Sequence, residues 1–163
     1  MNVSILSTEK VAQKIKRMAY EIWEKNSAEQ EVVILGIKEG GAVLAENLAN
    51  TLTEISTLKV TFAAITCNKK NIQHEAIVFE ADVDGKSVVL VDDVANSGKT
   101  LIYTMKQILD FNPKKIQLAV LVDRKHKDFP IMPDIIGHSL FTTIQENIEV
   151  TFEGNQITGA FIS

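Results

Sequence analysis

The fold of this chain is decided by one segment, Val88-Val89-Leu90-Val91-Asp92-Asp93-Val94-Ala95-Asn96-Ser97-Gly98-Lys99-Thr100. Its apolar start predicts a buried strand that ends at two adjacent carboxylates, and a loop rich in small hydroxyl residues then opens into a helix. Carboxylates accept hydrogen bonds from sugar hydroxyls, whereas loop amides and the positive end of a following helix hold phosphate. The segment therefore predicts a site for a phosphorylated ribose.

Length and composition limit the class of protein. The 163 residues, 45% hydrophobic and 23% charged, suit one soluble globular domain spanning residues 1–163. A net charge of −4 does not favour a bulk electrostatic nucleic-acid binder. The single cysteine, Cys67, excludes an internal disulfide and a multi-cysteine metal site. Because the N-terminus lacks an apolar signal core and no long apolar run follows, we expect a cytoplasmic protein with no membrane contact.

Strands and helices alternate along the chain. Apolar positions at three- and four-residue steps predict a helix from residue 7 or 8 to about residue 26. Unbroken apolar runs predict strands buried on both faces, as in parallel sheets covered by helices. These strands are expected at residues 32–37, 59–66, 88–91 and 116–122, shorter ones at 76–79, 148–152 and 156–162, and further helices at 42–52 and 100–111. This order predicts an α/β fold, a three-layer sandwich around a mainly parallel sheet.

Polar loops follow three of the predicted strands, at residues 38–41, 92–100 and 123–127. In parallel α/β sheets, ligands bind beyond the carboxyl ends of the strands. We therefore expect the three loops to converge on one cleft if their strands are neighbours.

The end of the first segment, Ser97-Gly98-Lys99-Thr100, also matches the end of a nucleotide-triphosphate P-loop. That motif needs its first glycine at the place where Asp93 stands, and a carboxylate there would repel phosphate. We therefore reject the P-loop. A solvated turn or a helix cap is the alternative reading of the two acids, but two acids abutting four apolar strand residues favour a ligand.

Residues 89–100 resemble the ribose-phosphate signature of type I phosphoribosyltransferases, in which two acids at a strand end precede a Thr/Ser-Gly-x-Thr turn. A second block narrows the resemblance. The run IQLAVLVDR at residues 116–124, with His126, Pro130-Ile131 and Pro133-Asp134 beyond it, is similar to the bifunctional pyrimidine-operon attenuator / uracil phosphoribosyltransferase family, and so are Gly36-Ile37-Lys38, Gly41 and Leu44-Ala45. The resemblance covers about residues 35–152. It implies the type I fold with a small hood, built from about residues 130–163 and the N-terminal segment.

The resemblance implies a role for each matching residue. The catalytic residues would be Asp92, Asp93 and Lys69, and the acids would bind the ribose hydroxyls of phosphoribosyl pyrophosphate. The ribose 5-phosphate site would comprise Asp92, Asp93, Ala95, Asn96, Ser97, Gly98, Lys99 and Thr100. Pyrophosphate would lie on the turn Lys38, Glu39, Gly40 and Gly41, and the base beside Asp123, Arg124 and Ile148. Mg²⁺ would bridge pyrophosphate and ribose hydroxyls, with Asp92 as the candidate protein ligand.

The implied reaction displaces pyrophosphate from the anomeric carbon of the sugar by a nitrogen of the base. Positioning, metal-assisted charge stabilisation and exclusion of water would be the work of the protein. Such enzymes close a mobile loop over the reactants. Residues 68–75 are the candidate loop, where Lys69 and Lys70 could meet the pyrophosphate; two solvated lysines on a turn are the alternative reading.

Two positions favour a pyrimidine acceptor, most simply uracil. Purine-using relatives carry a lysine where this chain has Asp123 and an acid where it has Asn96. An ionised Asp123 only accepts hydrogen bonds, and an amide is no base. The hood would place Ile148 against the ring and Glu153 near it; a buried core isoleucine and an exposed turn acid are the alternative reading.

Three departures from the attenuator family matter. Gly40 stands where that family has an arginine, and Glu39 is close by. The candidate lid is shorter, with Asn68-Lys69 in place of a Tyr-Arg pair. The basic surface that grips RNA in that family keeps some charge here (Lys14, Lys16, Arg17, Arg124, Lys125 and Lys127), but Tyr20 replaces the usual histidine. RNA binding is therefore an open but disfavoured expectation.

Three functions remain open. The favoured one is a Mg²⁺-dependent transfer of phosphoribosyl to uracil by a homodimer. The first alternative is a catalytically weak regulatory protein that senses phosphoribosyl pyrophosphate or nucleotides, supported by the short lid and the missing arginine. The second is a purine phosphoribosyltransferase, supported by Gly40-Gly41 and Gly98-Lys99-Thr100.

Overall fold

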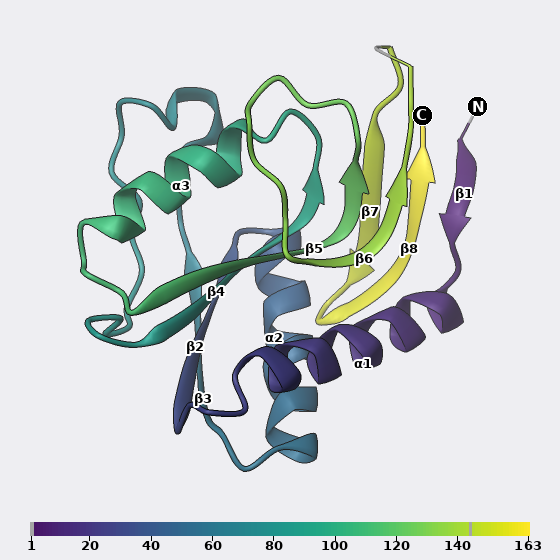
Figure 1. The fold of residues 1–163 in the computed structure, drawn as a ribbon. Coiled ribbons are helices and arrows are strands. Elements are labelled where there is room, and N and C mark those ends of the chain that lie inside the picture. Colours follow the sequence, from purple (N-terminus) through teal and green to yellow (C-terminus); the bar gives the residue numbers. More distant parts are fainter. Residues whose placement is uncertain (1, 144) are drawn as a thin grey trace.

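The computed structural model describes residues 2–143 and 145–163, which form a parallel central sheet with helices on both faces and a small second sheet at one end (Figure 1). The central sheet has the strand order β3-β2-β4-β5-β6. Its strands are β2 (Glu31–Ile37), β3 (Lys59–Ile65), β4 (Ser87–Ala95), β5 (Lys115–Arg124) and β6 (Ile135–Leu140), and every neighbouring pair is parallel.

Three α-helices of the described chain cover this sheet: α1 (Thr8–Lys25), α2 (Gly40–Ile55) and α3 (Lys99–Leu109). In Figure 1, α1 and α2 lie on one side of the sheet and α3 on the other. One apolar core joins α1 and α2 to the sheet and the second sheet, and another lies on the α3 side. The sequence prediction of a three-layer α/β fold is confirmed.

The start of α1 shows how local chemistry determines where a helix begins. The Ser7 hydroxyl accepts a hydrogen bond from the Lys10 amide, which satisfies a donor that the first turn leaves open. Val11, Ile15, Met18 and Ile22 recur at helical spacing and are buried against the sheet.

The second sheet is the expected hood. It is antiparallel, with the order β1-β8-β7, and contains β1 (Val3–Leu6), β7 (Ile148–Glu153) and β8 (Gln156–Ile162). The expected start of the hood near residue 130 is wrong, because β6 belongs to the central sheet. The predicted strand at residues 76–79 is also wrong: this stretch makes a single antiparallel bridge between Thr66 and Val78.

The strand order creates a switch point at the carboxyl edge. The chain passes from β2 to β3 on one side of the sheet and from β4 to β5 on the other. Because β2 and β4 are neighbours, the loops after them lie together where ligands bind in open α/β sheets. No helix in the described residues has the length and apolar character of a membrane crossing.

Candidate active site

A cavity of about 440 Å³ lies at the carboxyl end of β4. Three parts of the chain line it: the segment after β3, the stretch from the end of β4 to the first turn of α3, and β7. The lining residues are Lys69, Asp92, Asp93, Val94, Ala95, Asn96, Ser97, Gly98, Lys99, Thr100, Leu101, Ile148, Glu149 and Val150. The structure thus brings together every residue of the expected ribose 5-phosphate set, together with Lys69 and Ile148.

The loop between β4 and α3 is held in a shape suited to an anion. Gly98 has φ +84°, a left-handed conformation that side chains disfavour. The Ser97 hydroxyl accepts from the Lys99 amide at 3.2 Å, and the Gly98 carbonyl accepts from the Ile102 amide at 3.0 Å as α3 begins. The loop and the positive end of an 11-residue helix therefore meet at one wall of the cavity.

The two acids near the carboxyl end of β4 are each held by the amide of the residue that follows. Asp92 Oδ1 accepts from the Asp93 amide, and Asp93 Oδ1 accepts from the Val94 amide, each at 2.9 Å. Asp92 is 3% exposed, and its burial, followed by the negative charge of Asp93, raises its pKa well above the usual value, whereas Lys69 acts in the opposite direction. A bound cation, or hydroxyl groups that donate to these acids, would offset the cost of burying the Asp92 carboxylate and its repulsion from Asp93.

The turn after β2 lies against the acids. The Lys38–Glu39 peptide is cis. A Cβ built on Gly40 would collide with the Asp93 carboxylate, and one on Gly41 would lie 2.9 Å from Asp92 Cα. Gly40 and Gly41 therefore allow the turn to touch both acids. Lys38 instead lines a separate hollow of about 410 Å³ beside β3, so its side chain is not part of the cavity wall.

Lys69 comes from the short 3₁₀ turn Lys69–Asn71, which the Asn68 side chain begins by accepting from the Lys70 amide at 3.2 Å. The segment behind it is anchored. Ile72 is 1% exposed within the core on the α3 side. Gln107 of α3 accepts from the Ile77 amide at 2.7 Å and donates to the Glu75 carbonyl at 3.0 Å. The expected lid region is thus tied to α3, with Lys69 left at the cavity.

The expected base-binding residues divide into two groups. Ile148 lines the cavity, together with Glu149 and Val150 of the same strand. Asp123 and Arg124 do not line it: Asp123 is paired with Lys127, and Arg124 donates to the Thr143 carbonyl.

Glu149 is the acid of β7 that sequence reasoning missed. Glu153, which was expected near the ring, lies at the far end of β7 opposite Gln156. The signal that could have found Glu149 is its place next to Ile148 in the same strand.

The donor set suits a magnesium ion carried by the substrate. Among residues 2–143 and 145–163, no three His, Cys, Asp and Glu side chains gather as a metal-binding group. Asp92 and Asp93 supply carboxylate oxygens at the cavity wall. Mg²⁺ is commonly held by one or two carboxylates together with substrate phosphates, so the two acids fit it.

Comparison with known proteins identifies the family. The phosphoribosyl transferase domain matches residues 2–151. "Bifunctional protein PyrR" of Geobacter sp. (strain M21) is 37% identical over 164 residues, which covers 94% of this chain and 93% of that protein. The protein of the same name from Citrifermentans bemidjiense is 39% identical over 168 residues, covering 96% and 95%.

Solved structures show the same fold. A hypoxanthine-guanine phosphoribosyltransferase from Bacillus anthracis superposes with a TM-score of 0.77 at 19% identity, over 97% of this chain and 96% of that chain. Since the relatives match almost from end to end, this chain belongs to the phosphoribosyltransferase family and is an enzyme of the phosphoribosyltransferase type.

Proposed function

We propose that the enzyme transfers the phosphoribosyl group of phosphoribosyl pyrophosphate to uracil and releases pyrophosphate, with Mg²⁺ as cofactor. One observation carries this proposal: the acid pair and the phosphate-binding loop line the same cavity at the switch point of the sheet. A ligand that carries vicinal hydroxyls and a phosphate on one five-membered ring satisfies both walls at once.

The residues of the cavity divide the work of the reaction. The amides of Asn96 to Thr100 hold the 5-phosphate, and Asp92 and Asp93 accept from the ribose hydroxyls. The turn at Gly40 and Gly41 brings the backbone after β2 to the pyrophosphate. As the bond to pyrophosphate breaks, positive charge develops on the sugar, and the fixed carboxylates stabilise it. Lys69 approaches the leaving group with the opposite charge. Bound Mg²⁺ would neutralise the charge that builds on pyrophosphate.

The choice of uracil depends on the base wall. Asn96 lines the cavity where purine-using relatives carry an acid, and its amide cannot take a proton. Asp123, which stands where those relatives carry a lysine, lies outside the cavity lining and carries no argument about the base. The two relatives compared above are both named "Bifunctional protein PyrR", which supports the narrower family suggested by residues 116–134. The solved purine enzymes are under 25% identical and carry no argument about the base.

A sensor of phosphoribosyl pyrophosphate with weak turnover is the second candidate. The observation that favours it is the turn after β2, where Gly40 offers no cation and Glu39 adds an exposed acid. Both candidate functions require binding of phosphoribosyl pyrophosphate, and they differ in whether a base is consumed.

A turnover assay with a panel of bases tests the proposal. Purified protein with Mg²⁺ and phosphoribosyl pyrophosphate is expected to convert labelled uracil to its nucleotide. Turnover of hypoxanthine with no turnover of uracil would replace uracil by a purine. Tight binding with no base consumed would establish the sensor, and no binding at all would refute both.

The resembled family also leads us to propose that the protein is a homodimer and that it is located in the cytoplasm. Light scattering at several protein concentrations would measure the molecular mass and so test the dimer. Four of the six cations expected at an RNA surface, Arg17, Arg124, Lys125 and Lys127, make contacts within the chain. Arg17 donates to the Ile136 and Gly137 carbonyls, and Lys125 and Lys127 pair with Asp123. These contacts support the sequence-based view that RNA binding is disfavoured.

A further inference from the structure

The loop between β5 and β6 rests directly on the phosphate-binding loop. The amides of Asp128 and Phe129 both donate to the Ser97 carbonyl at 3.1 Å. A Cβ built on Gly98 would meet the Ile131 side chain at 2.6 Å and Lys127 Cδ at 3.4 Å. The turn that faces the cavity on one side is therefore covered on its other side by residues 127–131.

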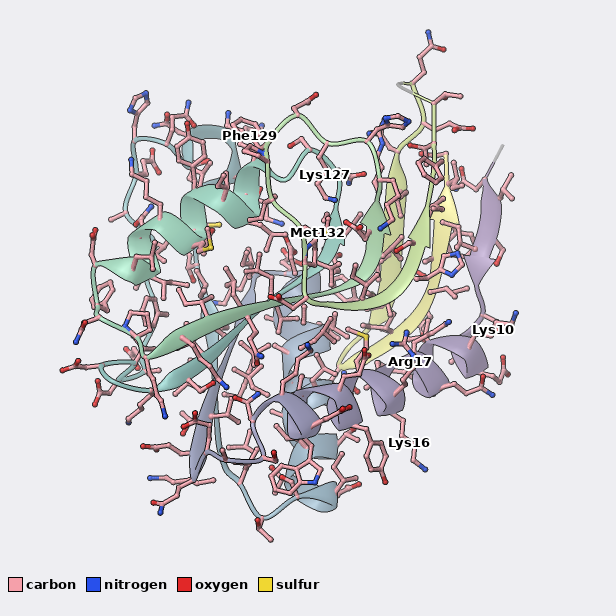
Figure 2. All side chains as sticks on the ribbon, viewed as in Figure 1. Lys10, Lys16, Arg17, Lys127, Phe129 and Met132 are labelled. Atoms are coloured by element: carbon pink, nitrogen blue, oxygen red, sulfur yellow. The ribbon has the colours of Figure 1, made fainter. Side chains whose placement is uncertain are left out.

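A buried ion pair fixes this covering loop to the sheet. Lys127 Nζ lies 2.6 Å from Asp123 Oδ1, with the two side chains 9% and 1% exposed. Asp123 is the next-to-last residue of β5, so its place is set by the sheet. Lys125 is a weaker partner, 3.6 Å from Asp123 Oδ2 and 37% exposed. Figure 2 shows Lys127 and Phe129 on this loop, well apart from Lys16 and Arg17 of α1.

We propose that Asp123 and Lys127 are a positioning pair for the 5-phosphate: their ion pair holds residues 127–131 against Ser97 and Gly98 and so keeps the loop amides in their binding geometry. The inference rests on the proposed function for the identity of the phosphate. It also gives Asp123 a role that the base does not require. Although the resemblance placed Asp123 at the base, its carboxylate is committed to two lysines outside the cavity lining.

Direct contact between Lys127 and the phosphate is the competing role. Lys127 Nζ is bound to Asp123, and only the middle of its side chain approaches Gly98. Positioning requires both partners, so removing either should weaken phosphate binding. Direct contact requires Lys127 alone, and Asp123→Asn would then leave binding intact or strengthen it.

The test uses a double variant, because a single substitution would leave a buried charge without its partner and could unfold the protein. Asp123→Leu/Lys127→Met removes the pair while keeping comparable side-chain volumes. We expect the Kd for ribose 5-phosphate and the KM for phosphoribosyl pyrophosphate to rise about tenfold, with kcat at saturation nearly unchanged. Lys125→Met, which removes the exposed partner, is the matched control and should behave as wild type. Lys127→Arg should restore most of the affinity that Lys127→Gln loses.

Each outcome has one meaning. Wild-type protein that fails to bind ribose 5-phosphate and phosphoribosyl pyrophosphate would refute the proposed function itself. Wild-type protein that binds, with a folded double variant of equal affinity, would overturn only the positioning role. Asp123→Asn separates positioning from direct contact, because it removes the charge of Asp123 and leaves Lys127 in place. Reduced affinity of that variant supports the inference, and unchanged or increased affinity contradicts it, whether or not the double variant folds.

Discussion

The carboxylate of Asp93 occupies the space that a side chain on Gly40 would need. This contact joins the turn after β2 to the acid pair near the end of β4, across two neighbouring strands of the sheet. The expected pyrophosphate and ribose subsites are therefore packed as one unit. An arginine, which the resembled family has at this place, could not enter here unless Asp93 moved.

Gly40→Ala tests that contact. The new methyl group should push the Asp93 carboxylate from its place and lower kcat/KM for phosphoribosyl pyrophosphate by about 10²-fold, the scale of a misplaced catalytic group. Gly85→Ala is the control: it has open space but φ +67°, so it should cost about 1 kcal/mol of stability and leave kcat/KM unchanged. Steady-state kinetics and urea unfolding measure the two effects. Wild-type kinetics in Gly40→Ala would contradict this prediction and show that the turn can shift to accommodate a methyl group without displacing the Asp93 carboxylate.

Asp93→Asn should weaken binding of phosphoribosyl pyrophosphate with little change in thermal stability. A hydrogen bond to a charged acceptor contributes roughly 1.5–3 kcal/mol, which corresponds to a loss of affinity of about 10- to 100-fold. Calorimetric titration and thermal unfolding measure both quantities, with Asp82→Asn on the surface as control; its side chain is 72% exposed. A large loss of stability with unaltered affinity would make these acids structural.

Asp92→Asn should stabilise the unliganded protein at neutral pH. The raised pKa of Asp92 means that the native state binds more protons than the unfolded state between the unfolded pKa, about 3.9, and the folded value. The stability of the wild type therefore falls as pH rises through that window, and the deficit persists above it. The variant lacks this cost. Urea unfolding from pH 4 to 8 should show its advantage growing with pH; an advantage that shrinks with pH would reverse the assignment. Ligand affinity should fall at the same time.

Gln107→Leu should release the segment that carries Lys69. The loss of its two hydrogen bonds, to Ile77 and Glu75, should speed hydrogen exchange at the Ile77 amide and lower kcat several-fold. Gln73→Leu, at an exposed position of the same segment, is the matched control. Unchanged exchange at Ile77 in the Gln107 variant would show that Ile72 alone anchors the segment.

The sequence predicted those elements whose signal is local. The apolar runs of β2, β4 and β5 require no knowledge of their neighbours, because a strand buried on both faces is apolar throughout. β1 and β6 escaped prediction for the opposite reason. β1 has four residues and pairs with β8 about 150 residues later, and β6 is an edge strand with His138 and Ser139 in its second half. Only tertiary pairing reveals such strands.

The site residues likewise divide into those with a local sequence signal and those whose contacts only the tertiary structure reveals. Residues 92–100 form one continuous motif, and the structure places all of them at the cavity. The surroundings of Asp123 were harder to predict, because its partner Lys127 lies on the following loop. A sequence resemblance at one position does not show which group that side chain contacts.

A crystal of the enzyme with Mg²⁺ and ribose 5-phosphate or phosphoribosyl pyrophosphate tests the central claim most directly. The account predicts phosphate density against the amides of residues 96–100, with the ribose hydroxyls facing Asp92 and Asp93. A sugar phosphate bound elsewhere, with this cavity filled only by water at saturating ligand, would contradict it.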